Sequence, residues 1–131
     1  MNTIIVAGPV IVEDSKVLLV KHGDDKFWKF PGGRLEDFDF QTKDDVLEET
    51  CRREVKEEMG IEIEIVRSLL PMLIRKDDDT NVILLHYLAK RVGEIAAGDD
   101  IAEWKWVDID NLPNDIAPNI KVVINELIHW D

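Results

Sequence analysis

The nine residues Arg53-Glu54-Val55-Lys56-Glu57-Glu58-Met59-Gly60-Ile61 mark the end of a helix and place three glutamates on it. The sequence predicts that this helix begins at Asp44 or Asp45, either of which is a good N-cap. It should end near Met59, because Gly60 favours a helix stop. At 100° per residue, one apolar stripe about 120° wide is formed by Leu47, Cys51, Val55 and Met59.

The three glutamates lie on one side of this helix. Measured from the start of the apolar stripe, Glu54 falls at about −20°, Glu58 at about 20° and Glu57 at about −80°. Glu58 therefore lies within the stripe that should face the core, where an unpaired carboxylate costs several kcal/mol or becomes protonated. A divalent cation such as Mg²⁺, which prefers oxygen ligands, removes that problem. From the helix alone, an equally good interpretation is a solvated acidic face on which Arg53 pairs with Glu57.

The remaining chain predicts strands, turns and one further helix. The expected strands are Ile4–Val12, Lys16–Val20, Ile61–Ile65 with a continuation to Ile74, Val82–Ala89 and Glu103–Ile109. Asp37–Asp44 is expected to be an acidic loop and 77–81 the turn of a hairpin. Asn119–Trp130 is predicted as a helix with a stripe formed by Ile120, Val123, Ile124, Leu127 and Ile128. Strands around one central helix, followed by a last helix, predict an α+β sandwich with a mixed sheet.

Length and composition narrow the class of protein. The chain has 131 residues, 45% hydrophobic and 34% charged, which fits one globular domain over residues 1–131. No run approaches the roughly 20 apolar residues of a membrane span, and the N-terminus lacks signal-peptide features, so no membrane contact is expected. The net charge of −12 argues against a nucleic acid polymer as partner. The single cysteine, Cys51, fits the cytoplasm and is expected to be buried.

A turn before the helix supplies a second motif. Pro31-Gly32-Gly33 is a firm turn signal, and its glycines let main-chain groups approach a ligand closely. Phe30–Gly33 and Arg53–Ile61 together resemble the motif of Nudix (MutT-like) hydrolases, which reads Gly, five residues, Glu, seven residues, then Arg-Glu-aliphatic-x-Glu-Glu-x-Gly-aliphatic. The second part matches at every position. Trp104–Pro113 is similar to a later segment of these enzymes, so the likeness covers most of the chain.

The segment between the two parts of the motif departs from the family pattern. Nineteen residues separate Gly33 from Arg53, where the pattern has thirteen, and the middle glutamate is missing as such. Asp39 lies at the right distance from Gly33, whereas Asp45 lies at the right distance from Arg53; Glu36 is also in the loop. We favour Asp45 for the middle position, because it keeps its place relative to the helix.

The resemblance implies a Nudix fold, in which a mixed β-sheet lies between helices as an α/β/α sandwich. It also implies hydrolysis of a diphosphate linkage in a small nucleotide by water attack on phosphorus, with Mg²⁺ or Mn²⁺ as cofactor. The implied metal ligands are Glu54, Glu57, Glu58 and the Gly33 carbonyl. Arg53 would orient the carboxylates by charge-assisted hydrogen bonds. The candidates for the general base are Glu54 and Glu57 on the helix and Asp100 or Glu103 across the cleft.

Substrate contacts outside the motif are less sharply indicated. The candidates are Arg34 for a phosphate, Trp28 for stacking on a base, and Asp45. Surface charge explains an arginine equally well, and core packing explains a tryptophan better. The same two interpretations apply to Lys29, Arg75, Trp104 and Trp106, whereas His22 and His86 are expected to be structural.

Two alternatives to an enzyme stay open from the sequence. A Nudix-fold sensor would bind a nucleotide without cutting it, and such a domain should have lost some of the glutamates that this chain keeps. A non-enzymatic protein could use the acidic surface to bind a basic partner. For an enzyme, the candidate substrates are oxidised or unmodified nucleoside triphosphates, ADP-ribose or another sugar nucleotide, and dinucleoside polyphosphates. A homodimer is the default oligomer.

Overall fold

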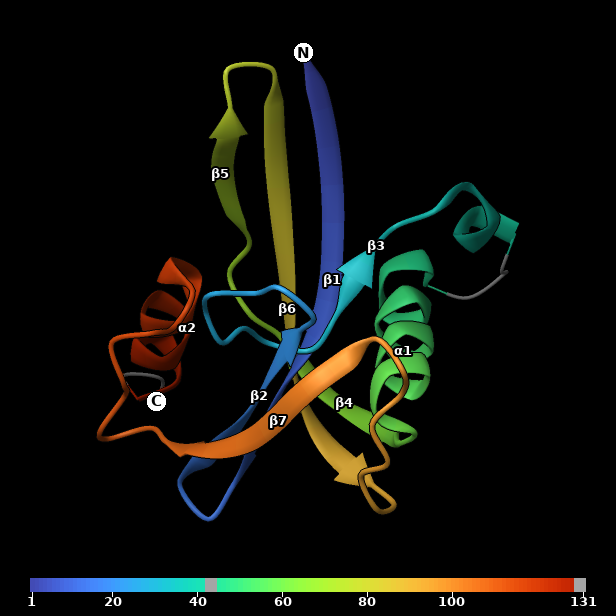
Figure 1. The fold of residues 1–131 in the computed structure, drawn as a ribbon. Coiled ribbons are helices and arrows are strands. Elements are labelled where there is room, and N and C mark those ends of the chain that lie inside the picture. The colour runs from blue at the N-terminus through green and yellow to red at the C-terminus, as the bar shows by residue number, and fades with distance from the viewer. Residues whose placement is uncertain (42–44, 129–131) are drawn as a thin grey trace.

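The computed structural model describes residues 1–41 and 45–128, and within them a seven-stranded sheet lies between two helices (Figure 1). The predicted α+β sandwich is confirmed. In chain order the elements are β1 (Asn2–Glu13), β2 (Lys16–His22), β3 (Gly33–Arg34), the 3-10 helix Asp37–Gln41, α1 (Val46–Met59), β4 (Glu62–Ser68), β5 (Met72–Asp77), β6 (Thr80–Val92), β7 (Ile101–Asp108) and α2 (Pro118–Ile128). Asp44 and Trp130, offered by the sequence as helix ends, lie outside the described residues. No helix in these ranges is both long enough and apolar enough to cross a membrane.

The sheet is built around two long strands that run parallel to each other. The strand order is β4-β6-β1-β2-β7, with β3 paired to β1 and β5 paired to β6. β1 and β6 are parallel, and the other pairs are antiparallel. The centre of β1 is an almost continuous apolar run because both of its faces are covered, and Ala7, Val10 and Ile11 are fully buried there.

Helix α1 covers one face of the sheet (Figure 1). Its N-cap is Asp45, and Gly60 ends it with a left-handed φ of 67°, as the sequence predicts. Cys51, Val55 and Met59 have no exposed surface, so the predicted apolar stripe is the packing face of α1.

Helix α2 covers the opposite face (Figure 1). Ile120, Val123 and Ile124 are buried against the sheet, as predicted. The prediction that Ile128 joins them is wrong, since its side chain is 51% exposed. It lies about 80° around the helix from Ile120, at the edge of the stripe, in the last described residue of α2.

Two predicted segments differ in detail from the structure. The strand that begins after Ile61 does not continue unbroken to Ile74, because β4 ends at Ser68 and β5 begins at Met72. Pro71, which has no N–H to donate to a ladder, lies in this break. The acidic stretch expected to be a loop contains the 3-10 helix Asp37–Gln41, which matters for the site described below.

The connection between β6 and β7 docks on the C-terminal end of α1. Ala96 N–H donates to the Met59 carbonyl at 2.8 Å, and Gly98 N–H donates to the Glu58 carbonyl at 2.7 Å. These bonds satisfy carbonyls that have no partner inside the helix. The approach is so close that a Cβ on Gly98 would lie 2.6 Å from the Glu57 carbonyl oxygen. The connection therefore holds the next residues, Asp99 and Asp100, beside α1.

His86 is a buried polar residue in the centre of β6. Its side chain is 5% exposed and makes an edge contact with the Phe30 ring, with ring centroids 5.4 Å apart. Burial lowers the pKa of His86 from 6.5 to about 4. The imidazole is therefore neutral in the folded protein at pH values where an unfolded chain would already protonate it.

Replacing Gly98 with alanine should destabilise the fold. The added methyl group meets the main chain of α1, which cannot move aside as a flexible side chain would, so the free energy of unfolding should fall by about 1–3 kcal/mol. Urea denaturation at pH 7.5 measures this. Gly23→Ala is the matched control, because a Cβ there meets no atom within 4 Å. Equal stability of the two variants would show that the docking is not tight.

The burial of His86 should make stability depend on pH below 6.5. As pH falls from 6.5 toward 4, the unfolded chain gains a proton that the folded protein does not, so stability decreases over this window. Urea denaturation at pH 7.5 and pH 4.5 should show that the wild type loses about 2 kcal/mol more than His86→Gln. Parallel losses in both proteins would contradict a lowered pKa at this residue.

Candidate active site

Glu54 and Gly33 bring helix α1 and the Pro-Gly-Gly turn together. Gly33 begins β3 and pairs with Ala7 of β1, which fixes the turn against the sheet. A Cβ on Gly33 would lie 2.1 Å from Glu54 Oε2, so any larger residue would displace the carboxylate from this position. The two parts of the sequence motif are therefore in contact in the structure.

Glu58 is buried between the same turn and the end of β2. Its side chain lies within the predicted apolar stripe and the residue is 7% exposed. Gly32 N–H donates to Oε1 at 2.8 Å, and His22 Nε2 lies 2.5 Å from Oε2. Burial raises the pKa of Glu58, while the Gly32 hydrogen bond and the nearby His22 act to lower it.

Arg53 links three carboxylates on the outer side of α1. Its guanidinium donates to both oxygens of Asp39, at 2.9 Å and 3.0 Å. It also lies 3.0 Å from Glu54 Oε1 and 3.3 Å from Glu57 Oε1. The Phe38 ring covers it at 4.6 Å. This arrangement fits the orienting role that the resemblance implies for Arg53.

The two candidates for the middle acid of the motif, Asp45 and Asp39, have different partners in the structure. Asp45 Oδ1 accepts the N–H groups of Leu47 and Glu48 at the exposed start of α1, away from Arg53. Asp39, only 8% exposed, takes the place beside Arg53 because the 3-10 helix folds the longer loop back onto α1. Burial acts to raise the pKa of Asp39, but the hydrogen bonds from Arg53 and from the Glu36 N–H, together with the charge of Arg53, outweigh it and the pKa is lowered. Asp39 is therefore an ionised partner of Arg53.

A cavity of about 320 Å³ lies beside these residues. Its lining is formed by His22, Lys29, Gly32, Gly33, Glu54, Glu57, Glu58, Asp99 and Asp100. The cavity therefore contains every implied metal ligand and one of the two candidate acids across the cleft. The sequence offers Lys29 as a phosphate contact or as surface charge and His22 as structural, and the structure places both in this lining. Asp99 was not singled out by the sequence, because it belongs to no motif.

Other predicted site residues lie outside this lining. Trp28 is buried in the core, and Lys21 and Lys105 lie over its ring at 4.9 Å and 4.2 Å, so the ring is not open to a base. Arg34 lines a separate hollow beside the first residues of β1. Glu103 lies opposite Lys21 in the β2–β7 ladder. Asp45 is used as the helix cap.

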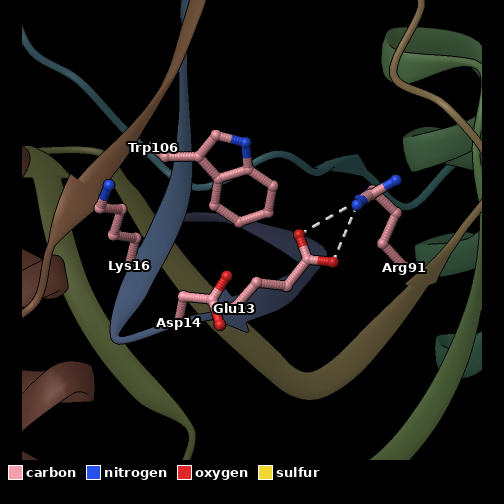
Figure 2. Close-up of a pocket in the computed structure, with 5 residues that line it drawn as sticks. All are labelled: Glu13, Asp14, Lys16, Arg91 and Trp106. Carbon is pink, nitrogen blue, oxygen red and sulfur yellow. Dashed lines mark hydrogen bonds and ion pairs between the residues drawn. The ribbon is translucent and has the colours of Figure 1, made fainter.

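A larger hollow of about 550 Å³ lies at the other end of β2 and is lined by Glu13, Asp14, Lys16, Arg91 and Trp106 (Figure 2). Arg91 pairs with Glu13, with Nη2 2.9 Å from Oε1. The charges that a ligand would meet are thus partly paired with each other, and none of the α1 glutamates reaches this hollow. Its size therefore does not make it the active site.

The donors around the smaller cavity fit a hard divalent cation. Carboxylate and carbonyl oxygens are the groups that Mg²⁺ prefers. Burial raises the pKa of Glu54, Arg53 acts to lower it, and the neighbouring Glu58 and Glu57 raise it further, so a cation would relieve real repulsion. Among the described residues no three such groups already converge as a metal cluster. Glu54 faces Arg53, Glu58 faces His22, and the Glu57 side chain is 60% exposed.

Comparison with known proteins identifies the family of the chain. The family model described as NUDIX domain matches residues 1–127. The chain is similar to an ADP-ribose pyrophosphatase from Methanocaldococcus jannaschii, with 33% identity over 127 residues that cover 92% of this chain and 70% of the relative. It is also 37% identical over 65 residues to a MutT-like protein from Streptomyces ambofaciens, covering 50% of this chain and 38% of that protein.

Solved structures show the same fold. The MutT NUDIX hydrolase from Burkholderia pseudomallei superimposes with a TM-score of 0.81 at 24% identity, covering 97% of this chain and 99% of that chain. The MutT protein from Methanosarcina mazei Go1 gives a TM-score of 0.79 at 18% identity, covering 97% of this chain and 94% of that chain. These similarities show the fold, while the family model and the Methanocaldococcus relative show the family. The chain belongs to the Nudix hydrolase family and is a pyrophosphohydrolase that acts on phosphoric anhydrides.

Proposed function

We propose that the protein is a Mg²⁺-dependent hydrolase of a diphosphate linkage in a nucleoside diphosphate-linked substrate. The observation that carries this proposal is the cavity that is lined by Glu54, Glu57 and Glu58 together with Gly32 and Gly33. A diphosphate is strongly anionic, so an acid-lined cavity can accept it only together with cations. Members of the family generally use divalent metal ions, in agreement with this chemistry.

We assign different roles to the residues around the cavity: metal binding, orientation of the carboxylates and contact with a phosphate. Glu54, Glu57, Glu58 and the Gly33 carbonyl would hold Mg²⁺ or Mn²⁺, which when bound supplies charge neutralisation and Lewis-acid activation of water. Arg53, held by Asp39, keeps Glu54 and Glu57 oriented. Lys29, which also lines the cavity, is placed to contact a phosphate oxygen.

A carboxylate must take the proton of the attacking water. The water oxygen forms the new bond to phosphorus, the anhydride P–O bond breaks, and the leaving phosphate keeps its electron pair. Glu54 and Glu57 stay candidates for this base within α1. Across the cavity the candidate is Asp100, because the docked connection brings it into the lining whereas Glu103 lies outside it.

A second hollow of about 250 Å³ adjoins the acidic cavity and shares Lys29 and Gly32 with it. Its lining is largely apolar and includes Phe30, His86 and Asn119. Asn119 Nδ2 lies 3.1 Å from His86 Nε2, and His86 Nδ1 has no hydrogen-bond partner in the described part of the chain. Aromatic rings with a few polar groups suit a nucleoside. We propose that the nucleoside end of the substrate binds here.

ADP-ribose is the first substrate to test. The Methanocaldococcus relative is named as an ADP-ribose pyrophosphatase, and the two adjoining hollows offer separate places for a diphosphate and a nucleoside. Nucleoside triphosphates, other sugar nucleotides and dinucleoside polyphosphates complete the panel. We also propose a cytoplasmic location, because the single cysteine, Cys51, allows no internal disulfide and fits a reducing compartment. A homodimer stays the default expectation.

Glu54→Gln and Glu57→Gln should each lower kcat by at least about 100-fold with saturating Mg²⁺, because each removes a charged oxygen from the metal and base set. Release of AMP from ADP-ribose, or of product from the best substrate of the panel, measures this. Glu62→Gln is the matched control, since Glu62 is exposed on β4 and pairs with Lys56. Near-normal turnover of Glu57→Gln would remove Glu57 from the proposed machinery.

Asn119→Ala should weaken substrate binding without changing the chemical step. Losing one hydrogen bond in the nucleoside hollow costs about 1 kcal/mol, so KM should rise about fivefold while kcat stays within threefold. Steady-state kinetics on the preferred substrate measure both constants. Asn125→Ala provides the control, because Asn125 is exposed on α2 and outside this hollow. An unchanged KM would place the nucleoside elsewhere.

A further inference from the structure

His22 ends β2 where the ladder with β7 changes register, between Lys21 and His22. The main chain there is anchored, since His22 N–H donates to Asp25 Oδ2 at 2.8 Å. Lys29 Nζ lies 3.0 Å from the same oxygen and helps to hold Asp25. The imidazole is therefore carried on a fixed stretch of backbone, and it lines the acidic cavity rather than the core.

Glu58 receives one donor on each carboxylate oxygen, from two different elements. Gly32 N–H donates to Oε1 at 2.8 Å, and His22 Nε2 lies 2.5 Å from Oε2. An ionised carboxylate can only accept, so His22 donates here as the tautomer that carries its proton on Nε2. Two donors on opposite sides fix the plane of a carboxylate, and each oxygen keeps a lone pair for another partner. The carboxylate is thus held in one orientation inside a cavity that its own helix lines.

We propose that His22 is a positioning residue, whose Nε2–H holds Glu58 in the orientation in which it ligates the metal. The inference rests on the proposed metal-dependent function. Groups that orient a ligating side chain typically contribute 10–100-fold to metal affinity. Without His22, one oxygen of a buried carboxylate loses its donor and the side chain is free to turn toward Lys29, which lines the same cavity.

The main rival is a direct contact between His22 and a substrate phosphate. The two roles differ in what they require. Positioning acts on the protein without substrate, so it changes the affinity for metal alone. A phosphate contact acts only when substrate is bound, so it changes KM and leaves the metal affinity of the free protein intact.

Binding of Mn²⁺ to the nucleotide-free protein, followed by the electron paramagnetic resonance signal of free Mn²⁺, tests the proposal. His22→Ala should weaken Mn²⁺ binding by about tenfold or more. His22→Gln should restore most of the affinity, because the glutamine amide nitrogen reaches the position of Nε2. His22→Asn should not restore it, because its amide nitrogen reaches only as far as Nδ1. Lys21→Ala is the control, because Lys21 precedes His22 in the chain but its side chain lies over the Trp28 ring. This variant should bind Mn²⁺ like the wild type.

Glu58→Gln serves as the reference for the site, and thermal unfolding checks that each variant is folded. Weaker binding in Glu58→Gln and His22→Ala, with rescue by glutamine, is the expected result. If Glu58→Gln weakens binding but His22→Ala stays within twofold of the wild type, this proposal is overturned and the metal site stands. If the wild type and Glu58→Gln bind Mn²⁺ equally, the metal role of Glu58 fails and the proposal fails with it. A raised KM with unchanged Mn²⁺ affinity in His22→Ala would assign His22 to the substrate instead.

Discussion

The carboxylate of Glu58 is buried on the face of α1 that packs against the sheet, and much of the surrounding structure compensates for that burial. A buried carboxylate needs donors or a cation. Two donors reach it, one from the Pro-Gly-Gly turn and one from the end of β2. Both segments must therefore lie against α1, and this draws the turn, the strand and the helix into one cavity. The contacts that satisfy the buried Glu58 carboxylate therefore also leave its oxygens at the wall of that cavity, where they can bind a cation.

Helix α1 organises both sides of the cavity because it is held at both ends. Asp45 caps its start, and the connection after β6 satisfies the Met59 and Glu58 carbonyls at its end. That connection continues directly into Asp99 and Asp100, so the acids across the cleft are positioned by the helix that carries the glutamates. Relative motion between the two sets of acids would require breaking the docked main-chain hydrogen bonds. The site is therefore built for fixed separations rather than for closure of a mobile loop.

Local patterns in the sequence were sufficient to predict the bounds and the packing face of α1. The N-cap, the apolar stripe, the glycine stop and the burial of Glu58 all follow from spacing along one helix, and the structure confirms each of them. Contacts between distant segments were not accessible in this way. His22 and Glu58 are 36 residues apart and share no pattern. Trp28 is a residue type that can stack on a base, but its burial beneath Lys21 and Lys105 depends on how β2 and β7 pair.

The lengthened loop shows what spacing along the chain leaves out about the middle acid. Spacing from Gly33 selects Asp39 and spacing from Arg53 selects Asp45, and the second is favoured because helices preserve spacing. In the structure, Asp39 is the acid whose carboxylate reaches the guanidinium of Arg53. A loop of any length can place an acid at that point, and the 3-10 helix Asp37–Gln41 does so with Asp39. Arg53 in turn contacts Glu54 and Glu57, so the acid acts on the cavity only through arginine. An aspartate on a longer loop can therefore stand where the family pattern has a glutamate on a shorter one, because the guanidinium, rather than the count of residues, fixes the position.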